Sequence, residues 1–141
     1  MLMDVKTEIS CEVAMKVAFY DLDPLQIVWH GHYLKYFDIA RAELFDLAGL
    51  DLFDFHAKTG IIFPIIRTAV KHIQPLRQGN SFVCRATVKE ARSKIVCTFE
   101  VRLSEDRKLC ARGTTEQVAV RASDMEMQYA IPEEIRRALG G

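Results

Sequence analysis

The sequence predicts an α+β fold in which an antiparallel sheet of about five strands curls around one long, largely buried helix. Two patterns lead to this expectation. Apolar residues recur at helical spacing from about residue 31 to 48, and several later segments alternate apolar with polar side chains. With 141 residues, of which 50% are hydrophobic, the chain is long enough to bury one proper core. We therefore expect residues 1–141 to form a single domain.

The predicted central helix follows a first strand that we place at residues 11–19, CEVAMKVAF. The main apolar stripe of the helix consists of Tyr33, Phe37, Ala40, Leu44 and Leu47. Its other faces also carry apolar side chains, namely Leu34, Tyr36, Ile39 and Phe45. A helix that is apolar on several sides is usually buried. Gly49 stands where a C-terminal cap belongs, which places the end of the helix near Ala48.

The second half of the chain predicts strands, after a stretch at residues 50–60 to which no regular element is assigned. The predicted strands are residues 61–74, with a break at Pro64, then 81–91, 94–104 and 108–122. The middle two alternate most clearly, so that one face of each strand is apolar and the other polar. This pattern is typical of antiparallel strands with one face on a core. The polar turns ARSK and SEDRK join neighbouring strands as hairpins.

The chain ends in a short predicted helix at residues 132–139, PEEIRRAL. Pro132 suits its first turn, and acidic residues stand beside its N-terminus. A single sheet wrapped on one helix leaves its edges and outer face incompletely covered. We therefore expect the protein to self-associate.

Charge and cysteine usage limit the classes of function. Nineteen basic residues balance nineteen acidic ones, so no long-range field favours nucleic acid or an anionic membrane. The four cysteines, Cys11, Cys84, Cys97 and Cys110, have no CxxC spacing, which favours reduced core residues over disulfides or metal ligands. The first ten residues are too polar for a signal peptide, and no apolar run approaches the roughly 18 residues of a membrane span. We expect a soluble, cytoplasmic protein without membrane insertion.

Residues 19–33, FYDLDPLQIVWHGHY, concentrate the side chains that are capable of chemistry. Asp23 precedes a proline and is expected in a turn, and His30 lies directly before the helix. Backbone N–H groups at a helix start can stabilise an oxyanion, so a carboxylate on the preceding loop suits acyl transfer or hydrolysis. Spacing alone leaves open that Asp23 is only a turn residue. His30 and His32 lack the further ligands that a metal site requires, so no metal is expected.

Residues 19–45 resemble the signature of the 4-hydroxybenzoyl-CoA thioesterase family, which has the hotdog fold. The motif DPLQIVW is similar to the 4-hydroxybenzoyl-CoA enzyme, and VWHGHYLKYF with the following AR is similar to the Tol-Pal-associated acyl-CoA thioesterases. The segments KHIQPLRQGN and KEARSK, and the strand order, also stand in family-like places. The resemblance therefore covers most of the chain and implies a hotdog fold within the α+β class.

The resemblance implies roles for individual residues. Asp23, the second acid of the D-x-D motif, matches the catalytic carboxylate of the family. His30 matches the position whose backbone amide polarises the thioester carbonyl, and its imidazole is implicated in members that have histidine there. Phe19 stands where some members have a functional tyrosine. Gln26 replaces the usual glycine, so if that glycine serves a positive φ, Gln26 is either strained or reshapes the loop.

The residues expected to bind substrate are Trp29, Gly31, Tyr33, Arg92 and Lys94. Gly31 belongs to the helix start, and Trp29 and Tyr33, with the segment IIFPII, are expected walls of an acyl pocket. Arg92 and Lys94 lie at positions similar to those where family members hold the nucleotide end of coenzyme A, a polyanion that needs local cations.

The implied activity is hydrolysis of an acyl-CoA, or of an acyl-carrier-protein thioester, to the free acid and thiol. Asp23 would act as a nucleophile through a mixed anhydride or as a general base for water. Coenzyme A enters as part of the substrate, and no other cofactor is expected. Active sites of the family lie at a dimer interface, which implies a homodimer or a homotetramer. Two alternatives remain, a hotdog dehydratase or hydratase and a non-catalytic acyl-binding hotdog protein.

Overall fold

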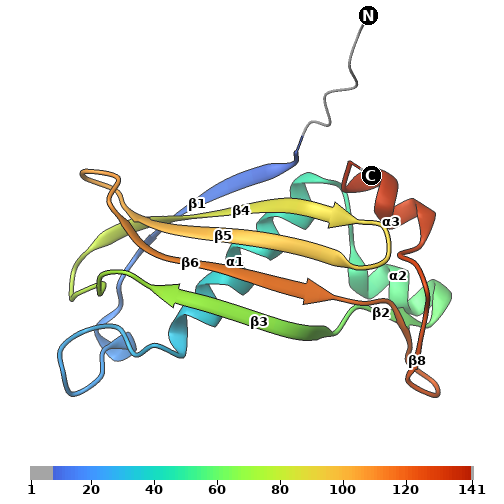
Figure 1. Ribbon diagram of the computed structural model, residues 1–141, viewed down its shortest axis with the longest axis horizontal. Helices are drawn as coiled ribbons and strands as arrows, with labels where there is room; N and C mark the ends of the chain where they lie inside the picture. Colours follow the sequence, from blue (N-terminus) through green and yellow to red (C-terminus); the bar gives the residue numbers. More distant parts are fainter. Residues whose placement is uncertain (1–7, 141) are drawn as a thin grey trace, which may run out of the picture.

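The computed structural model describes residues 8–140 and shows one long helix packed across an antiparallel sheet (Figure 1). The helix α1 spans His32–Leu47. The sheet has the strand order β1-β4-β5-β6-β3. Its strands are β1 Ser10–Lys16, β3 Ile65–His72, β4 Ser81–Ala91, β5 Ile95–Leu103 and β6 Leu109–Gln117. The predicted α+β class, with five long strands on one helix, is confirmed.

Smaller elements extend this layer at its ends. They are a 3-10 helix at Phe19–Asp21, the helices α2 Leu52–Thr59 and α3 Glu133–Ala138, and the short strands β2 Ile61–Ile62, β7 Val120–Arg121 and β8 Glu126–Met127. The expected break at Pro64 separates β2 from β3, and the final helix forms where PEEIRRAL predicts it. Of the first ten residues, which were judged too polar for a signal peptide, residues 1–7 lie outside the described part of the chain. Within residues 8–140, no helix is long and apolar enough to cross a membrane.

The helix α2 is absent from the sequence expectations. Only one of its side chains, Phe55, is buried, and Leu52 is partly buried against the core, so its apolar contact is short. Its signals lie at its ends instead. The side chain of Asp51 accepts a hydrogen bond from the backbone N–H of Asp54 at 3.0 Å, and Gly60 closes the helix with a φ of 76°. These are the usual caps of a helix start and end.

The expected burial of Leu47 is wrong, because its side chain is 68% exposed. Leu47 lies on the same face as buried Ala40, seven residues earlier, but it is the last residue of α1, so its exposure reflects its place at the helix end and not the helical periodicity. Leu34 and Ile39 are each 43% exposed. The helix α1 therefore buries one face in this chain rather than several.

The alternation predicted for the central strands is confirmed. Phe82, Cys84, Ala86 and Val88 of β4 are buried against α1, whereas Arg85 and Lys89 are exposed on the outer face. The cysteines behave as core residues, because Cys84, Cys97 and Cys110 are buried and all four cysteines are free. Burial raises the pKa of Cys84 to about 12 and that of Cys97 to about 11, so both are held as neutral thiols.

The position of α1 on the sheet depends on Phe37. Its ring is fully buried and stacks on Phe99 of β5, with ring centroids 4.5 Å apart and planes 12° apart. On the neighbouring strand β6, the backbone of Gly113 lies so close that a Cβ there would be 2.4 Å from the Phe37 ring. Only glycine leaves room for this contact, so Gly113 sets how closely the helix approaches the sheet.

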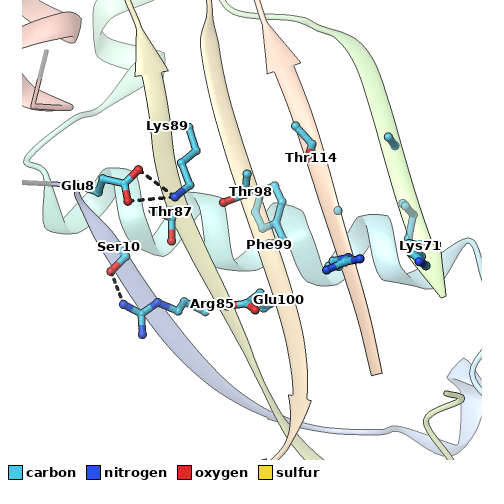
Figure 2. Close-up of a pocket in the computed structure, with 14 residues that line it drawn as sticks. Glu8, Ser10, Lys71, Arg85, Thr87, Lys89, Thr98, Phe99, Glu100 and Thr114 are labelled. Atoms are coloured by element: carbon cyan, nitrogen blue, oxygen red, sulfur yellow. Dashed lines mark hydrogen bonds and ion pairs between the residues drawn. The ribbon is translucent and has the colours of Figure 1, made fainter. Parts of the chain in front are cut away.

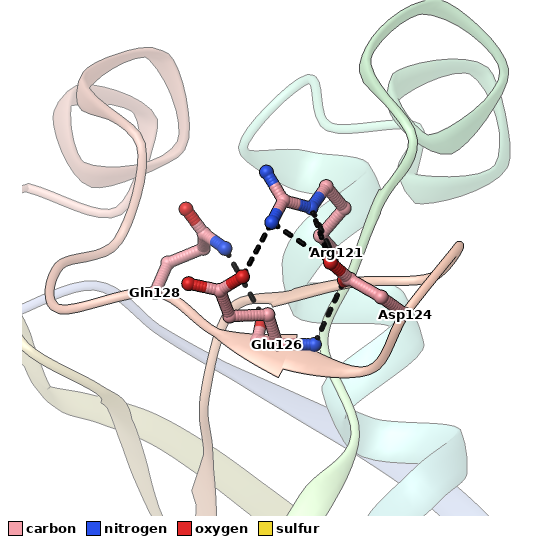
Figure 3. Close-up of polar contacts among 4 residues, drawn as sticks. All are labelled: Arg121, Asp124, Glu126 and Gln128. Carbon is pink, nitrogen blue, oxygen red and sulfur yellow. Dashed lines mark hydrogen bonds and ion pairs between the residues drawn. The ribbon is translucent and has the colours of Figure 1, made fainter.

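Charged contacts close the hairpin between β7 and β8 (Figure 3). The guanidinium of Arg121 donates to Asp124 at 2.9 Å and to Glu126 at 2.5 Å. The carboxylate of Asp124 also accepts the backbone N–H of Glu126 at 3.1 Å. These groups are exposed, so each pair contributes little to global stability, but together they define the turn that leads to α3.

The substitution Gly113→Ala tests how closely α1 packs on the sheet. We expect it to lower the free energy of unfolding by about 1–3 kcal/mol, because the added methyl group overlaps the Phe37 ring and forces a shift. Urea denaturation measures the change. Thr114→Ala is the matched control on the outer side of the same strand and should cost less. Equal stability of Gly113→Ala and wild type would contradict this account of the packing.

Candidate active site

A cavity of about 310 Å³ opens where the loop before α1 meets the end of β3. It is lined by Asp23, Leu25, Ile27, Val28, His30, Tyr33, His72, Ile73, Gln74 and Pro75. The side chains that can carry charge in this cavity are one carboxylate and two imidazoles, and most other lining groups are apolar. Among residues 8–140, no cluster of histidine, cysteine and acidic residues has a geometry that could hold a metal ion.

A tight hairpin turn holds Asp23. Its carbonyl accepts the N–H of Gln26 at 2.9 Å, and its N–H donates to the carbonyl of Ile27 at 2.8 Å. The backbone N–H of Leu25 donates to Oδ1 of Asp23 at 2.8 Å, which fixes the carboxylate. Oδ2 has no hydrogen-bond partner within residues 8–140. The Oδ2 atom of the half-buried Asp23 carboxylate is therefore free to interact with a molecule bound in the cavity.

Gln26 occupies the left-handed position of this turn, with a φ of 65°. The hairpin is closed by bridge pairing between Leu22 and Val28, on either side of Gln26. A side chain with a Cβ costs about 1–2 kcal/mol in this conformation, which glycine adopts freely. Of the two outcomes expected from the sequence, strain at Gln26 is the one found.

The start of α1 presents two unused backbone donors. The N–H groups of His30 and Gly31 have no acceptor within residues 8–140, whereas those of His32, Tyr33 and Leu34 donate to the carbonyls three residues earlier. The ring of Trp29 lies over Gly31, where a Cβ would be 2.2 Å from the indole. The glycine therefore allows Trp29 to cover the helix start. Trp29 and Gly31 do not line the cavity, whereas His30 and Tyr33 do.

Asp21 anchors the loop to α1, a role that the sequence reasoning did not assign to it. Its side chain is 3% exposed and accepts hydrogen bonds from Lys35 Nζ at 2.6 Å and Tyr36 Oη at 2.8 Å. Its carbonyl accepts the N–H of Trp29 at 2.9 Å. Burial alone would raise the pKa of Asp21, but the hydrogen bonds from Lys35 and Tyr36 outweigh it and lower the pKa.

His72 is the second residue that the sequence reasoning missed. It ends β3 and lines the cavity opposite the loop, with its ring centroid 4.8 Å from that of Tyr33 and 6.5 Å from that of His30. The hydroxyl of Tyr33 accepts the N–H of Leu76 at 3.4 Å, which ties this wall to α1. No sequence signal marked His72, because its place depends on how β3 pairs with β6.

The other predicted substrate-binding residues lie elsewhere in the chain. Arg92 and Lys94 form the turn between β4 and β5, at the end of the sheet where Ile95 and Ile65 both pair with Gln117. The segment IIFPII lies at that same end. The cavity with Asp23 lies at the opposite end of β3. Lys94 donates to Glu116 at 2.6 Å, and Arg92 is exposed.

A larger depression of about 840 Å³ lies on the outer face of the sheet (Figure 2). Its lining is mostly polar and includes one charged pair, in which Lys89 donates to Glu8 at 3.0 Å. Arg85 donates a hydrogen bond to the hydroxyl of Ser10 at 3.1 Å. One carboxylate of the depression, Glu100, also has an oxygen without a partner within residues 8–140, because Arg102 bonds only its Oε2, but no helix start adjoins this face. The smaller cavity is therefore the candidate active site.

The substitution Asp21→Asn should lower the free energy of unfolding at pH 7 by about 1–3 kcal/mol, because it removes a charged hydrogen-bond acceptor for Lys35. Since folding lowers the pKa of Asp21, its stabilisation is present above about pH 3.9 and lost as the pH falls through the lower value. Urea denaturation should show the gap between variant and wild type closing below about pH 4. The exposed Asp46→Asn control should show no such gap, and a gap that persists in acid would argue against the pairing.

The substitution Gln26→Gly should raise the free energy of unfolding by about 0.5–1 kcal/mol, because relief of the left-handed strain exceeds the added flexibility of the unfolded chain. Gln26→Ala keeps a Cβ and separates this effect from loss of the side chain. It should leave stability nearly unchanged in the same denaturation experiment. Equal shifts for both variants would show that φ is not the cause.

Comparison with known proteins places this geometry in a family. Residues 25–111, more than half of the chain, match the Thioesterase superfamily model. A 1,4-dihydroxy-2-naphthoyl-CoA hydrolase from Nostoc punctiforme is 27% identical over 120 residues, which cover 84% of this chain and 79% of that protein.

Solved structures agree on the fold. A 1,4-dihydroxy-2-naphthoyl-CoA thioesterase from Synechocystis superposes with a TM-score of 0.84 at 18% identity, covering 92% of this chain and 95% of that one. The 4-hydroxybenzoyl-CoA thioesterase from Pseudomonas sp. strain CBS-3 gives 0.81 at 22% identity, covering 92% and 98%. The resemblance seen in residues 19–45 and the hotdog fold it implied are thus confirmed. The chain belongs to the thioesterase superfamily.

Proposed function

We propose that this protein hydrolyses the thioester of an acyl-CoA to the free acid and coenzyme A at the cavity that holds Asp23. One observation carries the proposal. In a thioesterase-superfamily chain, the half-buried carboxylate of Asp23, with one unpaired oxygen, shares a cavity with His30 at a helix start. The N–H groups of His30 and of the adjacent Gly31 have no acceptor within residues 8–140. A carboxylate that attacks or activates water, and N–H donors that polarise the carbonyl, are the groups that thioester hydrolysis requires.

The proposed chemistry divides between loop and helix. The thioester carbonyl oxygen accepts hydrogen bonds from the N–H groups of His30 and Gly31, which stabilise the negative charge of the tetrahedral intermediate. In comparable sites one such donor is worth about 3–4 kcal/mol. Asp23 acts from the loop, either by attacking the carbonyl carbon to give a mixed anhydride or by taking a proton from the attacking water. The Leu25 N–H on Oδ1 leaves Oδ2 for this task.

The walls of the cavity define what it accepts. A volume of about 310 Å³ is at the lower end of the range for small-molecule sites. Leu25, Ile27, Tyr33 and Ile73 supply apolar surface for a compact acyl group, and the nucleotide of coenzyme A must lie outside. Coenzyme A or a carrier-protein arm is then part of the substrate, and the reaction requires no further cofactor.

A homodimer or homotetramer is part of the proposal. Seven of the eight residues of β3 are exposed, and within residues 8–140 β3 pairs only with β6, so the described sheet has an open edge beside the cavity. Because Arg92 and Lys94 lie at the far end of the sheet, they can reach the cavity only from a second copy of the chain. The four free cysteines support a reducing, cytoplasmic location.

A second activity is favoured by one observation, the presence of two imidazoles, His30 and His72, in the cavity with Asp23. Histidine and an acid are also the groups that hydrate an enoyl thioester. Membership of the thioesterase superfamily favours hydrolysis. Loss of enoyl absorbance without release of thiol would identify hydration instead.

The proposal is tested by offering the purified protein a panel of aliphatic and aromatic acyl-CoAs while free thiol is measured. Asp23→Asn should lower kcat/KM by about 10²-fold or more, since it removes the attacking or proton-accepting group. Asp46→Asn, an exposed carboxylate on α1, is the matched control and should match wild type. No thiol release from any substrate, or an unchanged rate in Asp23→Asn, would overturn the proposal.

A further inference from the structure

His72 stands at the point where the edge strand β3 reaches the cavity of Asp23. Figure 1 shows this end of β3 beside the loop that leads into α1. Backbone pairing with β6 fixes this end of β3. His72 is in register with Ala111, and the N–H groups of Ile73 and Gln74 both donate to the carbonyl of Cys110, at 2.8 and 3.0 Å. The strand therefore places the His72 imidazole on the wall of the cavity that faces the loop.

The ring nitrogens of His72 are not used by the fold. Its ring packs at 82° against Tyr33, with centroids 4.8 Å apart, and makes no hydrogen bond or ion pair within residues 8–140. A polar ring that lines the cavity without a protein partner can meet a substrate. Resting on the proposed function, we infer that His72 is the general acid that protonates the sulfur of the departing thiolate.

The other proton carriers of the cavity are less suited to this step. Burial raises the pKa of Tyr33 above its ordinary value near 10, so its hydroxyl is a poor acid near neutral pH. His30 lies on the side of the helix start, where the carbonyl oxygen binds, and its ring is next to Trp29, with centroids 5.1 Å apart. With the oxygen held there, the sulfur can be directed to the opposite wall, which His72 forms.

The proton balance closes for both routes of attack. When the C–S bond breaks, its electron pair stays on sulfur, and the N–H proton of the His72 imidazolium completes the thiol. In the anhydride route, neutral His72 then accepts a proton from the water that cleaves the anhydride, which restores the imidazolium and the Asp23 carboxylate. In the general-base route, Asp23 takes the water proton first and passes it on through solvent. The net reaction consumes one thioester and one water.

Leaving-group dependence separates acid catalysis from a structural role. An alkyl thiol such as that of coenzyme A has a pKa of about 8.5 or above and benefits from a proton as it leaves, whereas an electron-poor aryl thiolate leaves without one. The same acyl group is therefore offered as its CoA thioester and as its 4-nitrothiophenyl thioester. We expect His72→Phe to lower kcat/KM by about 10²-fold with the CoA thioester and by less than about threefold with the aryl thioester.

The two variants at His72 are chosen to keep the packing of the cavity wall that this residue forms. His72→Phe keeps an aromatic ring against Tyr33, and His72→Gln keeps polarity without an acidic proton. Both should show the selective loss. His56→Ala, an exposed histidine on α2, should change neither rate. Equal losses with both thioesters, or no loss with the CoA thioester, would overturn the role of His72 while thiol release by wild type and its dependence on Asp23 still stand. Failure of wild type to release thiol would instead remove the proposed function itself.

Discussion

The architecture of this protein depends on the contact of Phe37 with the sheet. Its ring lies flat on Phe99 and against the backbone of Gly113, so α1 rests at one depth and one place on the strands. The start of the same helix carries the unused amides of the candidate site. Gly113 pairs with Val70, two residues from the pairing of His72 with Ala111. The packing that seats the helix thus also sets the distance between the two walls of the cavity.

The two acids of the D-x-D motif have opposite environments two residues apart. Asp21 is buried and neutralised by Lys35, and it fixes the loop to α1. Asp23 is held only through its backbone and one oxygen, and the rest of its carboxylate remains open to the cavity. The strained Gln26 completes the turn between them and the helix. A rigid, anchored loop of this kind holds a reactive group without surrounding it with partners.

Local patterns in the sequence were sufficient for the elements with a periodic signal, such as β4, β5 and α1. They also placed Asp23 in a turn and His30 directly before the helix, because a proline turn and a helix start are both local features. They could not find α2, a short helix that buries only Phe55 and is marked mainly by the caps at its ends. Asp21 and His72 depend on partners distant in the chain, and a one-residue slip of β3 would turn His72 away from the cavity. Such placements are decided by register and tertiary packing.

Because β3 is an edge strand, the cavity can open without unfolding of the whole domain. Within residues 8–140 of one copy of the chain, β3 hydrogen-bonds only with β6, so the cavity can be lost by separating these two strands while α1 and the other strands stay together. Such subglobal opening requires less free energy than global unfolding. Amide hydrogens of β3 should then exchange with solvent sooner than those of β5 at the centre of the sheet. A ligand that contacts both walls binds only the closed form, so it slows this exchange in proportion to its occupancy.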